Sequence, residues 1–211
     1  MDDDVLPFPP GALVFKRLVM SAALVGCTLI GVAGPAQSAA RTPARLLTAD
    51  AFQQDCLDAH NTYRARHGVP AMQSDPQIVA FAQKWAAEMA RTRKFEHSTA
   101  DVRLPLHRDG SWGENTFYSM SSAPGQVVSC AEVVKGWYDE IKDYDFNNPG
   151  FSQKTGRFTQ VVWKSSTKLG CGRATTSAIP GRTETYIVCD YAPLGNLATA
   201  DLFKENVFPG R

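Results

Sequence analysis

The chain has 211 residues and a mass of 23.0 kDa, which suits one domain preceded by a leader. Its composition, 44% hydrophobic and 20% charged, is typical of a soluble globular protein and argues against disorder. The net charge of +1 supplies no strong attraction to nucleic acid or to a membrane surface, so we expect no nucleic-acid partner.

Residues 1–40 have the pattern of a secretory signal peptide. Lys16 and Arg17 precede an apolar run over residues 18–33, and small residues at 36–40 allow cleavage after Ser38 or Ala40. The alternative is a retained membrane anchor, because the run is nearly long enough to span a bilayer. We expect a cleaved leader, a linker at 41–47 and one domain at 48–211. The mature protein is then secreted and extracellular, with no stable membrane span.

Apolar periodicity predicts a first helix from a Thr48 cap to about His67, where Gly68 stops it. A second helix follows the cap Asp75 with Pro76 at its first position, and it ends near Thr92.

A third helix is expected after Gly125. Its apolar positions form a predicted buried stripe, with Trp137 and Glu140 beside it. The stripe consists of Val127, Ala131, Val134, Tyr138 and Ile141.

Three segments read as strands, at residues 113–119, 168–175 and 183–190. The last two form a hairpin through Ile179-Pro180-Gly181, which places Cys171 opposite Cys189. Propensity alone would also favour a strand at 158–163. Cys27 lies in the leader, and the other four cysteines form an even set that reads as two disulfides, with three ways of pairing them.

Four motifs, in order, carry a family resemblance: His60-Asn61-Thr62-Tyr63-Arg64, Gly113-Glu114-Asn115, the run from Gly156 to Trp163 and the run from Cys189 to Asn196. The chain resembles the CAP superfamily of cysteine-rich secretory proteins, antigen 5 proteins and pathogenesis-related 1 proteins. Within it, the segments 137–142, 148–151 and 203–208 resemble the Golgi-associated plant pathogenesis-related protein group. The likeness covers nearly all of the chain after about Ala49.

The resemblance implies an α/β fold, a three-layer α-β-α sandwich with a small, mainly antiparallel sheet. It makes the segment 158–163 a short helix. It also implies the disulfide Cys171–Cys189, which leaves Cys56 to pair with Cys130.

The family places two histidines and two glutamates around a central cavity, and in many members the histidines bind a divalent metal. The matching residues are His97, Glu114 and Glu140, but the second histidine is replaced by Arg157. Arginine has no lone pair for a metal and its charge repels one, whereas its planar fork suits a glutamate. We therefore expect an ion-pair network and no cofactor. Zinc held by His97 and the two glutamates through water is the alternative.

The resemblance also bears on function. Several family members bind sterols or fatty acids, and the resemblance implies an aromatic-rich motif matched here by Trp137, Tyr138, Tyr144 and Phe146. For each of these side chains, core packing is the competing interpretation. The chain has no Gly-x-Ser-x-Gly elbow and no His-Glu-x-x-His helix. We expect a non-enzymatic protein that binds a small hydrophobic ligand or a partner protein in defence or host interaction. The alternative is a metal-dependent or Ser-His-Glu hydrolase that uses the cleft.

Overall fold

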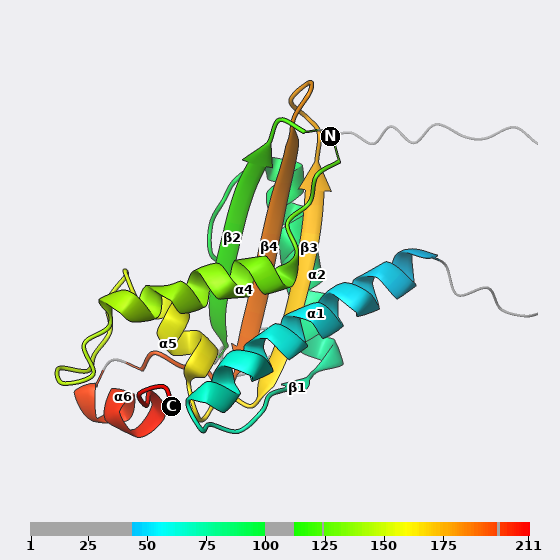
Figure 1. Ribbon diagram of the computed structural model, residues 1–211. Helices are drawn as coiled ribbons and strands as arrows, with labels where there is room; N and C mark the ends of the chain where they lie inside the picture. The colour runs from blue at the N-terminus through cyan, green and yellow to red at the C-terminus, as the bar shows by residue number, and fades with distance from the viewer. Residues whose placement is uncertain (1–43, 100–111, 124, 198) are drawn as a thin grey trace, which may run out of the picture. The chain divides into compact units, whose positions relative to one another are not determined.

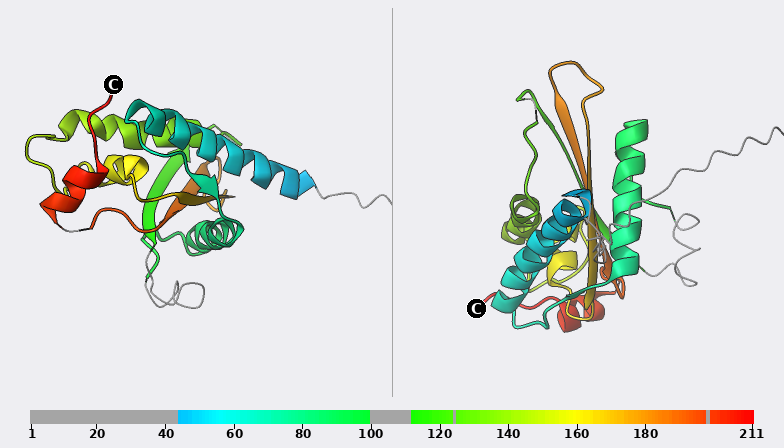
Figure 2. Two further views of the ribbon diagram at one scale, coloured as in Figure 1. Left: turned by 90° about the horizontal axis from the view of Figure 1, so that it is seen from below. Right: turned by 90° about the vertical axis from the view of Figure 1, so that its right-hand side faces the viewer.

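The computed structural model describes residues 44–99, 112–123, 125–197 and 199–211. Within the unit that begins at Arg41, a four-stranded sheet lies between two helical layers (Figures 1 and 2). Helix α2 (Pro76–Thr92) covers one face, and α1 (Ala44–Arg66), α4 (Cys130–Tyr138) and α5 (Gly156–Val162) cover the other. This is the predicted three-layer α-β-α arrangement.

The sheet has the order β1-β3-β4-β2, from strands β1 (Gln73–Ser74), β2 (Gly113–Ser121), β3 (Lys168–Thr176) and β4 (Thr183–Ala192). Strand β4 pairs antiparallel with both β2 and β3, and only the short β1 runs parallel to its neighbour. Cys171 lies opposite Cys189, so the predicted hairpin register is confirmed. The sheet is therefore mainly antiparallel, as expected.

Helix α2 lies unusually close to β3 because two glycines face it. A Cβ atom on Gly170 would lie 2.2 Å from the Val79 nitrogen, and one on Gly172 would lie 2.3 Å from the Gln83 Cα. Such distances exclude any side chain, so glycine at both positions lets the helix backbone pack directly on the strand. The predicted Asp75 cap is confirmed, since its carboxylate accepts from the amides of Gln77 and Ile78.

Helix α4 begins at Cys130, later than expected, because Ser129 and Glu132 form a reciprocal capping box. The predicted stripe is wrong in part: Val127 and Ala131 are exposed and Tyr138 and Ile141 are only partly buried. Trp137, expected beside the stripe, is buried in the core. The chain then continues as the short 3-10 helix η1 (Asp139–Asp143), which changes the direction of the buried face.

Both implied disulfides are present, Cys56–Cys130 between α1 and α4 and Cys171–Cys189 across the hairpin. Helix α5 confirms the short helix that the resemblance implied at 158–163. Helix α1 starts at Ala44, so Thr48 lies inside it and residues 44–47 are helical rather than linker. Ala, Arg and Leu are strong helix formers, which explains the extra turn. Helix α6 (Ala200–Asn206) had no sequence prediction.

The predicted leader lies outside the described residues. Within those residues, no helix has both the length and the apolar character to cross a membrane.

Candidate functional site

Glu114, on β2, is held by the loop that follows α2. That loop starts at Arg93, which has left-handed backbone, and the Trp85 indole fixes it by donating to the Glu96 carbonyl at 3.2 Å. One Glu114 oxygen accepts from His97 Nδ1 at 2.6 Å and from the Ser98 amide at 3.0 Å. The other accepts from the Ser98 hydroxyl at 2.5 Å. The Glu114 side chain is only 2% exposed, whereas that of His97 is 65% exposed.

Glu140 and Arg157 form a second, separate pair. Arg157 Nε and one terminal guanidinium nitrogen both lie 2.6 Å from Glu140 Oε1. Glu140 Oε2 accepts from the backbone amides of Arg157 and Phe158 at 3.1 and 3.2 Å. Those amides belong to the first turn of α5, whose preceding residue Thr155 makes no side-chain cap. Glu140 therefore caps α5 and also neutralises Arg157.

Asn115 lies between the two pairs. It follows Glu114 on β2, and its side-chain amide donates to the Arg157 carbonyl at 3.1 Å and to the Tyr191 hydroxyl at 3.0 Å. The four predicted site residues thus lie around one end of β2. Among the described residues, each of the two carboxylates has its own hydrogen-bond donors. The expectation that Arg157 pairs with a glutamate holds, and the partner is Glu140.

These contacts make a poor zinc site. Both glutamates are occupied by N–H or O–H donors, His97 has one ring nitrogen on Glu114, and Arg157 adds a positive charge. Zinc needs three or four lone-pair donors in close array. Among the described residues, the potential metal ligands that lie close to one another are the four cysteines. All four are paired in disulfides. Zinc at His97 remains a prediction, and no chemistry is derived through it.

The His60 motif supports the fold rather than the cleft. His60 is fully buried, with Nδ1 2.7 Å from the Cys56 carbonyl and Nε2 2.8 Å from the Tyr191 hydroxyl. A carbonyl can only accept, so Nδ1 carries the proton and Nε2 accepts from Tyr191. Burial lowers the pKa of His60 to about 4, which keeps the ring neutral.

Arg64, one helical turn later, is also buried and has no carboxylate partner in these contacts. Its guanidinium donates to backbone carbonyls of five residues at 2.8 to 3.4 Å, and burial lowers its pKa to about 10. The acceptors are Pro70, Val161, Trp163, Lys164 and Ser166. Arg64 thus joins α1 to the end of α5 and to the segment that follows it.

The four aromatic residues of the implied ligand motif pack inward. Trp137 and Tyr144 belong to the buried core, and Tyr138 stacks on Tyr63 with ring centroids 4.0 Å apart. Tyr138, Tyr144 and Phe146 all lie against Phe158, with centroids 5.5 to 6.3 Å apart. Core packing accounts for these contacts.

A hollow of about 310 Å³ lies in the loop after η1. Its lining contains two buried hydroxyls. That of Thr155 has no hydrogen-bond partner among the described residues, and that of Tyr144 accepts from the Gly150 amide. Phe151 stands at the hollow and is 58% exposed. The remaining lining residues are Asp143, Asp145, Asn148, Pro149, Gly150 and Ser152. Sequence reasoning did not propose Phe151 or Thr155, although Asn148-Pro149-Gly150-Phe151 carried part of the resemblance.

The three-layer fold is that of a CAP-type domain, and comparison with known proteins agrees. The model of the cysteine-rich secretory protein family matches residues 57–191, and the chain belongs to this family. Golgi-associated plant pathogenesis-related protein 1 of Homo sapiens is 38% identical over 158 residues, which cover 75% of this chain and 93% of that protein. Pathogenesis-related protein 1A of Nicotiana tabacum is 37% identical, covering 68% and 76%.

Three further comparisons concern location and fold. Secreted protein RBT4 of Candida albicans is 38% identical, over 71% of this chain and 37% of that longer protein. The crystal structure of NaASP2 with Zn²⁺ matches with a TM-score of 0.52 and 25% identity, covering 72% of this chain and 84% of that one. The structure of BmVAL-1 matches with a TM-score of 0.55 at 21% identity, over 72% and 82%, which shows the fold alone.

Proposed function

We propose that this protein is a secreted, non-enzymatic member of the family that binds a small lipid carrying a hydroxyl, such as a sterol, in the hollow after η1. The observation that carries the proposal is the hollow itself, which combines an exposed aromatic ring with the buried Thr155 hydroxyl, for which the described part of the chain supplies no hydrogen-bond partner. Secretion is supported by the leader pattern and by the secreted relative from Candida albicans.

The contacts of Ser98 argue against hydrolysis. In a serine hydrolase, the serine hydroxyl donates to the histidine, and the carboxylate orients that histidine from the other side. Here the Ser98 hydroxyl and His97 Nδ1 both contact Glu114, on its two different oxygens. The Ser98 hydroxyl therefore donates to the carboxylate and not to His97, which favours binding over catalysis.

The hollow suits an amphipathic ligand. Its volume is at the lower end for a ligand pocket, so it would hold a head group and part of the ligand body. The Phe151 ring and Pro149 offer apolar contact at the hollow. The Thr155 hydroxyl offers a hydrogen bond to the ligand head.

The negative charge of the hollow distinguishes the two lipid classes that the resemblance implied, sterols and fatty acids. Asp143 and Asp145 both line the hollow, so an ionised fatty acid would meet two carboxylates there. A sterol hydroxyl is neutral and meets no such repulsion. We therefore expect a sterol to bind more tightly than a fatty acid.

The test is equilibrium binding of a fluorescent sterol and a fluorescent fatty acid to the parent, Phe151→Ser and Phe95→Ser proteins. Phe95 is a matched control, because it is similarly exposed but lies in the loop after α2. Removing a ring that covers ligand costs about 1.5–3 kcal/mol, so Phe151→Ser should weaken sterol binding at least ~10-fold. Equal binding by all three proteins would contradict the site.

Lipid extraction and mass spectrometry of the purified protein test the ligand class independently. A fatty acid bound more tightly than the sterol would contradict the charge argument. If neither lipid binds and none is extracted, the lipid proposal fails and the partner-protein interpretation takes its place.

A further inference from the structure

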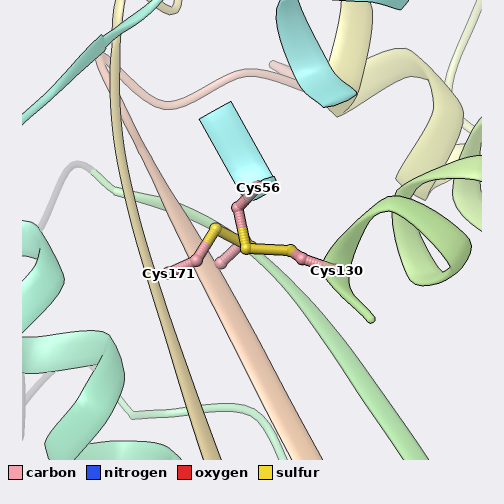
Figure 3. Close-up of side chains that lie close together, drawn as sticks. Cys56, Cys130 and Cys171 are labelled. Atoms are coloured by element: carbon pink, nitrogen blue, oxygen red, sulfur yellow. A yellow bond between two sulfur atoms is a disulfide. The ribbon is translucent and has the colours of Figure 1, made fainter. Parts of the chain in front are cut away.

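Two disulfides from different parts of the chain lie against each other in the core. The sulfur atoms of Cys56, Cys130, Cys171 and Cys189 all lie within 4.8 Å of one another, and all four residues are buried. They come from α1, α4, β3 and β4 respectively. Figure 3 shows the sulfurs of Cys56, Cys130 and Cys171 converging on one point between the two helices and the hairpin.

We propose that the reduced form of this chain binds one Zn²⁺ through the four cysteine sulfurs. In a tetrahedral Cys₄ site with Zn–S of about 2.3 Å, neighbouring sulfurs lie about 3.8 Å apart. Sulfurs of different disulfides lie at most 4.8 Å apart, so a shift of about 1 Å or less would bring them to that spacing. The two sulfurs within each disulfide need only separate to that spacing by side-chain rotation, over Cα atoms 5.0 and 4.2 Å apart.

Charged side chains of both signs lie beside the four cysteines. Cys130 is the first residue of α4, and Asp55, next to Cys56 on α1, accepts from the following amide, that of Ala131, at 3.1 Å. Arg173 lies two residues after Cys171, hence on the same face of β3, and its guanidinium covers the Phe52 ring at 4.5 Å. Phe52 is one helical turn before Cys56 on α1. Arg173 also interacts with the oppositely charged Asp55, so the spacing of the four sulfurs, and not the local charge, carries the proposal.

The chemistry balances as follows. A dithiol reductant supplies two electrons and two protons to each disulfide and leaves as its own disulfide, so two equivalents convert the four cysteines to thiols. Zinc then displaces four protons as four Zn–S bonds form. Disulfides persist in oxidising compartments and thiols in reducing ones. The same four positions would therefore tie α1, α4 and the hairpin together in either environment.

The test is to unfold and reduce the full chain, then refold it under a phosphine reductant with Zn²⁺ or with a chelator. We expect one zinc per chain by mass spectrometry, a higher unfolding temperature with zinc, and four thiols protected from alkylation until chelator is added. Cobalt(II) in place of zinc should give the thiolate charge-transfer bands of a tetrathiolate site. If the reduced chain fails to bind zinc, or fails to fold with it, the proposal is overturned.

Three variants identify the ligands. The Cys171→Ser/Cys189→Ser and Cys56→Ser/Cys130→Ser proteins should both lose stoichiometric zinc and the charge-transfer bands. His97→Ala should keep both, because His97 lies in the cleft and not among the sulfurs. Zinc that is lost with His97→Ala, or kept by either cysteine variant, would place the metal elsewhere and overturn the proposal. If neither cysteine variant folds, protection of four thiols in the parent still decides between the two outcomes.

Discussion

Two regions of the molecule each combine a histidine with an arginine, and they use them in opposite ways. On α1, His60 and Arg64 are buried and bond chiefly to backbone carbonyls and a tyrosine hydroxyl. In the cleft, His97 and Arg157 are largely exposed and pair with carboxylates. In the first region removing one side chain leaves buried polar groups without partners. In the second, water can replace what is lost.

The largest difference should appear when the two arginines are compared. Arg64→Met leaves the carbonyls of Val161, Trp163 and Ser166 buried without their donor. Each such loss is costly, so we expect the free energy of unfolding to fall by about 3–5 kcal/mol. Arg157→Met should cost less than about 1 kcal/mol, because its side chain is 51% exposed. Urea unfolding of both variants beside the parent measures the difference, and similar losses would contradict the comparison.

The buried His60 of the first region should make the stability of the fold depend on pH. The pKa of His60 is about 4 in the folded chain and 6.5 unfolded, so between these values only the unfolded chain holds the proton. Stability therefore falls as the pH drops from about 6.5 to 4, by up to about 3 kcal/mol. Burial also lowers the pKa of His67, which adds a loss of the same sign.

Urea midpoints at pH 7 and pH 4.5 test this effect. His60→Gln removes the titrating ring, so the gap between its two midpoints should be much smaller than in the parent. A parent gap that is unchanged by His60→Gln would show that the acid sensitivity has another source.

How far the sequence predicts these features depends on the range of the interaction. Asp75-Pro76, the hairpin register and the short helix α5 were predictable, because their signals are local or carried by a motif. The start of α4 was also encoded locally, in the Ser129–Glu132 capping box, and was overlooked in favour of apolar periodicity. Trp137 was misplaced for the same reason.

The sequence predicted which residues form the site but not which of them contact one another. The motifs gave His97, Glu114, Glu140 and Arg157, and the chemistry of arginine favoured an ion pair. Which glutamate Arg157 contacts depends on the angle between η1 and α5, which no local pattern specifies. The two hydrogen bonds from Ser98 to Glu114 were not predicted, because serine is common in loops. The hollow beside Phe151 likewise depends on how residues 143–155 fold around it, which no local pattern specifies.

The smallest predicted effect separates the two roles of Glu140. Glu140→Gln weakens both the cap on α5 and the ion pair, and we expect a loss of about 1–2 kcal/mol in unfolding free energy. Arg157→Gln removes only the ion pair and should cost less than about 1 kcal/mol. In the double variant the second loss should add little of its own, since the ion pair is already gone. Added salt should reduce the effect of Arg157→Gln and leave most of the effect of Glu140→Gln. If the two single variants were equally destabilising and equally sensitive to salt, Glu140 would act through its charge pair alone, and the cleft would contain no structural carboxylate at the start of α5.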